Sequence, residues 1–201
     1  IPAAGYGYAP AIGKDGRLYE FANWQLSIYD PETGISSPIS GGPTYRNWAA
    51  PVTGNDGKIY LLGGTDSRFN GFANVDIYDP ATKTWTTGAN APSPRSNMGA
   101  VLGKDGRIYL IGGDNPSAVP TAEVDAYDPS TNTWTEVASL VGPREFLTTS
   151  TASDGRIFVF GGRDSKFQQD INVEAYDPVS KSWSVAGTLP SKPEYPKAFS
   201  Y

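Results

Sequence analysis

The sequence contains no cysteine and no histidine among its 201 residues. Without cysteine the chain can form no disulfide and has no thiol chemistry, which is compatible with any compartment. Without histidine it lacks the commonest general base and the commonest transition-metal ligand of proteins. We therefore expect no cofactor, no transition metal and no redox activity, since the oxygen ligands that remain favour hard cations such as calcium.

Long apolar runs and an excess of positive charge are also missing. No apolar run approaches the length of a membrane span, so we expect a soluble chain, secreted or at a cell surface. The formal net charge of −5 argues against a nucleic-acid partner. The chain begins at Ile1 without an initiator methionine or a signal peptide, and we interpret it as processed, excised or incompletely represented.

What the sequence does contain is a repeat with a period of 49 residues, marked by Asp-Gly, Gly-Gly, Tyr-Asp-Pro and Trp. All four markers occur together in Lys104–Trp134. A fixed period of this length means that one supersecondary unit is used several times. The tyrosines of Tyr-Asp-Pro are Tyr29, Tyr78, Tyr127 and Tyr176, and the closing tryptophans are Trp85, Trp134 and Trp183.

Each marker has a structural reason. Asp-Gly lies between two alternating apolar runs and predicts a two-residue hairpin turn, because glycine accepts a positive φ freely. Gly-Gly is expected to end the second strand where a neighbouring backbone or ring comes close. Asp-Pro ends the third strand, since proline fixes φ and donates no hydrogen bond. The tryptophan belongs to a fourth strand, and four antiparallel strands per unit predict a propeller blade.

These features resemble the kelch repeat, which has an arginine before the first strand, Gly-Gly, a tyrosine before Asp-Pro and a spaced tryptophan. The resemblance covers essentially the whole chain and implies an all-β, kelch-type β-propeller in a single domain. We expect four four-stranded blades, with the tryptophans largely buried against the tyrosines of their own blades. The repeats span about 1–41, 42–90, 91–139 and 140–188.

A fifth unit begins at residue 189 and contains a surplus first strand alone, 189–201. One interpretation is a closed four-bladed ring with a redundant strand. The other is a segment of a larger ring, or of a ring that a partner chain completes. An open strand edge would then support self-association, because unpaired edges bind other strands.

The first repeat is atypical, since Gly-Gly becomes Ala22-Asn23 and the closing tryptophan becomes Ser36. Its second hairpin is predicted to be tight, with Trp24 near the tip. Terminal repeats are often atypical because they cap the array. Trp24 is therefore either part of a cap or a specialised binding residue.

Arg46, Arg95 and Arg144 occupy one repeat position, directly before the first strand. The kelch resemblance implies that this strand lines the central channel, with the arginines at the channel mouth. Guanidinium groups there would bind carboxylates or acidic peptides; the alternative is that they brace the loops between blades. Three acidic residues that precede the repeated tyrosine by two also match the kelch pattern and are interpreted as structural: Asp76, Asp125 and Glu174.

Two residues after each arginine the repeats diverge, to Trp48, Asn97 and Phe146. A position that is aromatic in some blades and polar in another fits a ligand-facing site. Strand alternation would direct these side chains to the same side as their arginines. The alternative is packing between blades.

The loops after Gly-Gly form a second candidate surface, in which Phe69 and Phe167 occupy equivalent places. Loops on a rigid scaffold commonly carry recognition, and an exposed phenylalanine there would need a partner. The alternative is that both rings fold back on the blade edge.

Together these features favour a non-catalytic module that presents one propeller face to a protein, an acidic peptide or a glycan. No Gly-x-Ser-x-Gly, P-loop or Cys/His metal set occurs in the sequence. Two alternatives remain open. Some kelch propellers are carbohydrate-active enzymes, and an isomerase- or lyase-like activity would use Arg144 and Glu145. A structural repeat protein would instead assemble through its open strand edge.

Overall fold

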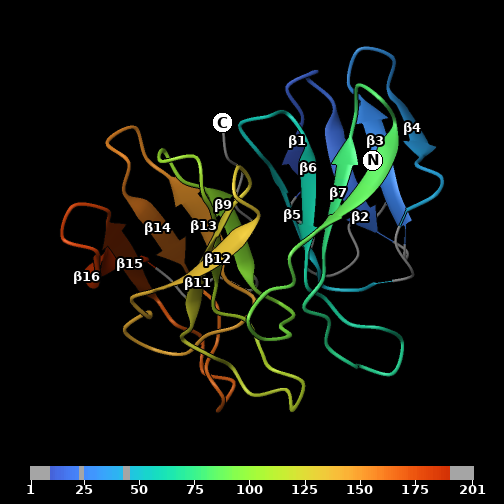
Figure 1. Cartoon of the computed structure of the whole chain (residues 1–201). Helices are drawn as coiled ribbons and strands as arrows, with labels where there is room; N and C mark the ends of the chain where they lie inside the picture. The colour runs from blue at the N-terminus through green and yellow to red at the C-terminus, as the bar shows by residue number, and fades with distance from the viewer. Residues whose placement is uncertain (1–9, 23–24, 43–45, 191–201) are drawn as a thin grey trace.

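The computed structural model describes residues 10–22, 25–42 and 46–190 (Figure 1). The regular elements in these residues are β-strands, arranged as four sheets of four antiparallel strands, each in sequence order. The described residues include no helix with the length and hydrophobicity needed to cross a membrane. The prediction of an all-β chain of four-stranded units is confirmed. The predicted surplus strand and Trp24 lie outside the described residues.

The first two sheets correspond to the first two repeats. The first consists of β1 (Ala11–Ile12), β2 (Leu18–Ala22), β3 (Gln25–Asp30) and β4 (Ile35–Pro38). The second consists of β5 (Ala50–Thr53), β6 (Ile59–Leu62), β7 (Val75–Asp79) and β8 (Thr84–Gly88).

The last two sheets repeat this arrangement. The third consists of β9 (Gly99–Leu102), β10 (Ile108–Ile111), β11 (Val124–Asp128) and β12 (Thr133–Val137). The fourth consists of β13 (Thr148–Thr151), β14 (Ile157–Phe160), β15 (Asn172–Asp177) and β16 (Ser182–Thr188). Each sheet is one blade, and the blades are numbered 1 to 4 in chain order.

The Asp-Gly turns differ from the predicted two-residue hairpin. In blade 1 the Gly13 N–H donates to the Arg17 carbonyl (2.8 Å) and the Gly16 N–H donates to the Gly13 carbonyl (3.0 Å). Three residues, 14–16, therefore separate the paired positions. Gly16 has a φ of +77°, which fits a three-residue loop that ends in a left-handed residue. Glycine is needed for the predicted reason, but the loop is longer than predicted.

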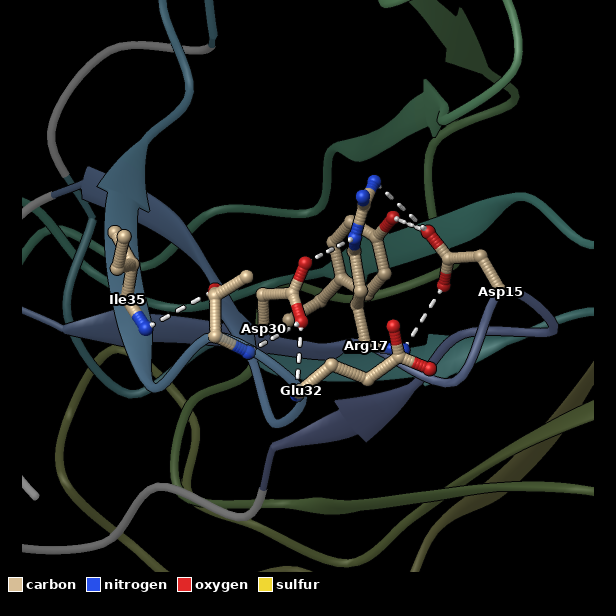
Figure 2. Close-up of polar contacts among 7 residues, drawn as sticks. Asp15, Arg17, Asp30, Glu32 and Ile35 are labelled. Atoms are coloured by element: carbon tan, nitrogen blue, oxygen red, sulfur yellow. Dashed lines mark hydrogen bonds and ion pairs between the residues drawn. The ribbon is translucent and has the colours of Figure 1, made fainter.

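Aspartate carboxylates complete the turns, as Figure 2 shows for blade 1. Asp15 Oδ1 accepts a hydrogen bond from the Arg17 N–H (3.2 Å), and Asp30 Oδ1 accepts one from the Glu32 N–H (2.9 Å). The Arg17 side chain joins the two turns, because its Nε donates to Asp30 Oδ2 (3.3 Å) and its Nη1 lies 3.8 Å from Asp15 Oδ2. The repeated aspartates thus satisfy backbone donors that the strands leave unpaired.

The blades are joined in an arc through their first strands. Strand β1 lies against β5, β5 against β9, and β9 against β13. Figure 1 shows β4 and β16 on opposite sides of the molecule, with β5 and β9 between them. In the described residues no comparable contact joins β13 to β1. The choice between a closed four-bladed ring and part of a larger ring stays a prediction.

The core consists of three apolar clusters, one at each interface between successive blades. The repeated tyrosine and tryptophan of a blade pack together, with ring centroids 5.1 Å apart for Tyr127 and Trp134. This pair faces the preceding blade, where Trp134 Nε1 donates to the Ala89 carbonyl (2.9 Å). Trp183 is buried, but Trp85 and Trp134 are only partly buried. The tyrosine contact is confirmed, and the burial is less complete than predicted because these rings lie at the blade edge.

The Gly-Gly pair ends the second strand where the next blade crosses it. Gly113 has a φ of +91°, and its N–H donates to the Arg144 carbonyl of the following blade (2.9 Å). A Cβ atom at Gly113 would lie 2.5 Å from the Ser96 carbonyl oxygen of its own blade. Only glycine fits both the backbone angle and the space, as predicted.

Candidate functional site

The three repeated arginines lie inside their blades. Arg46, Arg95 and Arg144 are 3%, 1% and 1% exposed. Their guanidinium groups form ion pairs with the carboxylates that were interpreted as structural: Arg46 with Asp76, Arg95 with Asp125, and Arg144 with Glu174.

Backbone carbonyls of the same blade complete these sites. Arg144 Nη1 donates to the Gly161 and Asn172 carbonyls, both at 3.1 Å. A guanidinium group with this many internal partners is held in place as a brace. The arrangement corresponds to the bracing alternative, and it removes the exposed basic rim on which the acidic-peptide expectation depended.

The divergent residues that follow the arginines have left-handed backbones. Trp48, Asn97 and Phe146 have φ values of +54°, +54° and +55°. The first strands begin after them, so strand alternation does not apply to these positions. A positive φ is uncommon for tryptophan and phenylalanine. Such strained positions cluster at binding sites.

Backbone hydrogen bonds join these three positions across the blades. The Asn97 N–H donates to the Trp48 carbonyl (3.2 Å), and the Phe146 N–H donates to the Asn97 carbonyl (2.8 Å). We call residues 48, 97 and 146 the backbone belt. Because main-chain atoms make the belt, its three side chains differ without changing how the blades meet.

The loops after Gly-Gly have one shape in blades 2 to 4. The Phe69 N–H donates to the Asp66 carbonyl (3.1 Å), and the Phe167 N–H donates to the Asp164 carbonyl (3.0 Å). Phe69 and Phe167 have φ values of +64° and +58° and are 66% and 71% exposed. Figure 1 shows the three loops on one side of the sheets, at the bottom of the view.

These loops and the backbone belt enclose one pocket of about 260 Å³. The two candidate surfaces of the sequence therefore line the same pocket. Its lining comes from three repeat positions and from the loops: Trp48, Asn97 and Phe146 of the belt; Ser96 and Glu145, which precede the belt; Thr65, Asp114 and Arg163, which follow Gly-Gly; and the loop residues Phe69, Gly71, Asn115, Pro116, Ala118 and Phe167.

The wall contributed by blade 4 contains a guanidinium group between two rings. The Arg163 Cζ lies 4.6 Å from the centroid of Phe146 and 4.8 Å from that of Phe167. Its Nε donates to Glu145 Oε1 at 2.7 Å. Cation–π contacts with both rings and a charge-assisted hydrogen bond hold this arginine in place.

The wall contributed by blade 2 has the aromatic pair but no arginine. Trp48 and Phe69 stack with centroids 5.5 Å apart and planes inclined by 21°. Thr65 occupies the place that Arg163 has in blade 4, and it is 4% exposed. Its buried Oγ1 has no hydrogen-bond partner in the described part of the chain.

Blade 3 contributes a carboxylate with neutral partners. Asp114 Oδ1 accepts hydrogen bonds from Ser96 Oγ (2.6 Å) and Asn97 Nδ2 (3.2 Å). Burial raises the pKa of Asp114, while these two hydrogen bonds and the charge of Arg163 lower it by less. The Asn97 Oδ1 atom is buried and has no hydrogen-bond partner among the described residues.

The second carboxylate of the pocket is Glu145, which is 6% exposed. Burial raises its pKa, the bond from Arg163 lowers it, and the charge of Asp114 raises it further. The two carboxylates therefore interact with each other. No group of three acidic, histidine or cysteine side chains with metal-binding geometry occurs in the described residues.

The structure thus brings together five predicted site residues, namely Trp48, Asn97, Phe146, Phe69 and Phe167. The sequence prediction missed Thr65, Asp114 and Arg163. Their signal was present, because the residue after Gly-Gly varies between threonine, aspartate and arginine while the Gly-Gly before it stays constant.

Comparisons with known proteins agree with this architecture. Residues 13–200 match a family profile described as the KLHDC2/KLHL20/DRC7 Kelch-repeats domain. The solved structure of YjhT matches with a TM-score of 0.80 at 16% identity, over 95% of this chain and 68% of that one. At this identity the match shows the fold alone. A search of curated proteins found no match. Repeat markers, blade structure and family profile coincide over nearly the whole chain, which therefore belongs to the kelch-repeat family.

Proposed function

We propose that this chain is a binding module whose ligand site is the pocket between the backbone belt and the Gly-Gly loops. The proposal rests on which residues are constant between the repeats and which residues vary. The constant residues, such as Arg95, Asp125 and Gly113, form the blades and their interfaces. The residues that vary from blade to blade converge on one concave site with aromatic walls, and such sites are the usual ligand sites of proteins.

The size of the pocket limits what enters it. Small-molecule sites commonly measure about 300–1,000 Å³, so a pocket of about 260 Å³ suits one side chain of a peptide or one sugar ring. The exposed rings of Phe69 and Phe167 at its edge offer further contact area to a larger partner. A protein segment or a glycan fits this description.

Peptide and glycan arrays probed with the wild-type protein and with Trp48→Asn test the proposal. Asparagine is the residue of the next blade at this position and tolerates a positive φ, so the variant should fold. Loss of an aromatic anchor commonly costs about 2 kcal/mol or more of binding energy, and we expect a corresponding loss of about 30-fold in affinity.

Val179→Asn is the matched control, because Val179 is 89% exposed at an outer turn and lies outside the pocket lining. Ligands that bind wild type, Val179→Asn and Trp48→Asn equally would show that the working surface is elsewhere.

A second candidate function is catalysis on a carbohydrate. It is favoured by the two buried carboxylates Asp114 and Glu145, whose pKa values are raised, because perturbed carboxylates in a pocket are typical of acid–base catalysis. Arg144, expected to act with Glu145, is buried behind the pocket. Conversion of sugars followed by NMR, with Glu145→Gln as the inactive variant, distinguishes an enzyme from a binding module.

A further inference from the structure

The two ends of the pocket are related by the repeat, and the difference between them is informative. In blade 4 two aromatic side chains enclose Arg163, which pairs with Glu145. In blade 2 the equivalent aromatic side chains are Trp48 and Phe69, and Thr65 stands at the arginine position. Blade 2 thus has the aromatic part of a guanidinium site without a guanidinium group of its own.

The charges of the lining show the same imbalance. Its described ionisable residues are Asp114, Glu145 and Arg163, two negative and one positive, which gives a net charge of −1. Arg163 contacts two aromatic rings and is hydrogen-bonded to Glu145. Asp114 accepts side-chain hydrogen bonds from two neutral groups, those of Ser96 and Asn97. Asp114 is therefore the carboxylate whose charge is least compensated.

The unpartnered polar atoms of the lining are two oxygens that can accept a hydrogen bond, and one of them, a threonine hydroxyl, can also donate one. Among the described residues that line the pocket, two buried side-chain atoms lack a hydrogen-bond partner: Thr65 Oγ1 and Asn97 Oδ1. The orientation of the Asn97 amide is fixed, because its Nδ2 donates to Asp114. Buried polar atoms are costly when left unpaired. A complementary ligand would bring N–H donors to these oxygens.

We propose that the pocket binds a cationic group, an alkylguanidinium or alkylammonium, against the Trp48–Phe69 pair with its charge toward Asp114. This inference rests on the proposed function, because it names the chemistry that the same pocket selects. Because Trp48 and Phe69 already stack on each other, the cation binds to an outer face of this pair and not between the two rings. Cations bind favourably to aromatic faces, and the Phe69 side chain is exposed.

The proposal reverses the expected sign of the ligand. An anionic group would face Asp114 and Glu145, and the one cation of the described lining is already paired. The basic partner also suits a chain whose net charge is −5, because opposite charge speeds encounter. Lysine and arginine side chains of a peptide, or a free amine, carry the required group.

Titration with matched probes tests the inference. The probes are acetyl-Gly-Arg-Gly-amide, its citrulline analogue, which has nearly the same shape without the charge, and acetyl-Gly-Glu-Gly-amide. Agmatine represents a free amine, and a methyl glucoside represents a neutral sugar. We expect the arginine peptide to bind at least about tenfold more tightly than the citrulline peptide, since charged hydrogen bonds are the stronger ones. The glutamate peptide should bind most weakly.

Protein variants test which residues cause the preference for the arginine peptide over the citrulline peptide. Asp114→Asn should abolish the preference for arginine over citrulline, whereas Glu136→Gln, an equal charge change at an exposed site on β12, should leave it intact. Asp114→Thr, with the residue of blade 2, replaces Asp114→Asn if that variant does not fold. Thr65→Arg should occlude the site by supplying an internal guanidinium, while Thr82→Arg at an exposed turn should not.

The outcomes separate the inference from the proposed function. If a sugar or the citrulline peptide binds as tightly as the arginine peptide, and Trp48→Asn abolishes that binding, the pocket is a ligand site but not a cation site. An arginine preference that survives Asp114→Asn and Thr65→Arg would place the cation elsewhere and overturn the inference. If no probe binds and the arrays are also negative, both proposals fail. Agmatine binding more tightly than the peptide would identify a free amine as the source of the cation.

Discussion

The buried arginines show how a polar residue that is constant in a repeat can brace its own blade. Arg95 and Asp125 form an ion pair inside blade 3, and Arg95 Nη1 also donates to the Glu123 carbonyl (3.0 Å). Desolvation of both charges is offset only while both partners are present. Loss of one partner therefore affects stability far more than loss of both.

We expect Arg95→Met to destabilise the protein by about 3–5 kcal/mol, because it leaves Asp125 buried without a counter-ion. Urea unfolding measures the change. The double variant Arg95→Met/Asp125→Leu should recover most of the loss, since an apolar pair of this kind is commonly neutral. A double variant that is no more stable than the single one would contradict the ion-pair explanation.

Asp114 gives the pocket a predicted pH response. Burial raises its pKa, so it takes up a proton at a higher pH than the ordinary aspartate value of about 3.9. Binding of acetyl-Gly-Arg-Gly-amide should therefore weaken as the pH falls from 7 through this raised pKa. The same protonation favours the folded state, because the folded pKa lies above the unfolded one. The loss of affinity should thus precede acid unfolding.

Titrations by calorimetry between pH 7 and 4 measure this response. The other ionisable groups that line the pocket in the described residues are Glu145 and Arg163, and burial raises the pKa of Glu145 as well. Asp114→Asn should remove the weakening, whereas Glu145→Gln should retain it. The reverse result would assign the pH response to Glu145.

Blade 2 is held to blade 3, and blade 3 to blade 4, at the end of the second strand, where Gly-Gly meets the following arginine segment. The Gly64 N–H donates to the Arg95 carbonyl (2.8 Å), and the Gly113 N–H donates to the Arg144 carbonyl (2.9 Å). The close approach leaves no room for a side chain at either glycine. The repeat of this contact explains why blades of different surface composition share one geometry.

The variants Gly113→Ala and Gly155→Ala distinguish the effect of the positive φ from the effect of limited space for a side chain. Their φ values are +91° and +92°, so alanine is strained by about 1–2 kcal/mol at both positions. At Gly155 the nearest atoms to a new Cβ lie at 3.9 Å, whereas at Gly113 the Ser96 oxygen lies at 2.5 Å. The Gly113→Ala variant should therefore be less stable than the Gly155→Ala variant by about 1–3 kcal/mol. Equal melting temperatures would show that the backbone relaxes at Gly113.

The sequence was sufficient for the blades because each marker has a local physical reason. Asp-Gly, Gly-Gly and Asp-Pro restrict the backbone wherever they occur, so the strands around them were predictable. The pocket depends on contacts between residues of different blades, such as Trp48 with Phe69 and Asn97 with Asp114. Strand alternation does not apply to Trp48, because Trp48 itself has a left-handed backbone and precedes the strand. No marker in the sequence indicates that backbone angle.

Across the molecule, stability is expected to be uneven. Among the described residues, blades 2 and 3 each share an apolar cluster with two neighbours, and blades 1 and 4 each share one. In repeat arrays stability is the sum of unit and nearest-neighbour contributions. The chain should therefore open from its outer blades rather than as one unit.

Hydrogen exchange measures this order. The amides of β6 and β10, which lie in blades with two packed neighbours, should exchange most slowly, and those of β2 and β14 should exchange faster. Saturating ligand should slow exchange in the loops of blades 2 and 3 in particular, because the inferred cation site lies there. Equal protection in all four sheets would mean that the array unfolds as a single cooperative unit.

The backbone belt has a practical consequence for protein engineering. Main-chain hydrogen bonds link positions 48, 97 and 146, so the identity of their side chains is not needed to join the blades. The same holds for the residues after Gly-Gly, where threonine, aspartate and arginine already coexist in one chain. A combinatorial library at these six positions, restricted at the belt to residues that tolerate a positive φ and excluding proline, would vary the chemistry of the cavity on the same backbone.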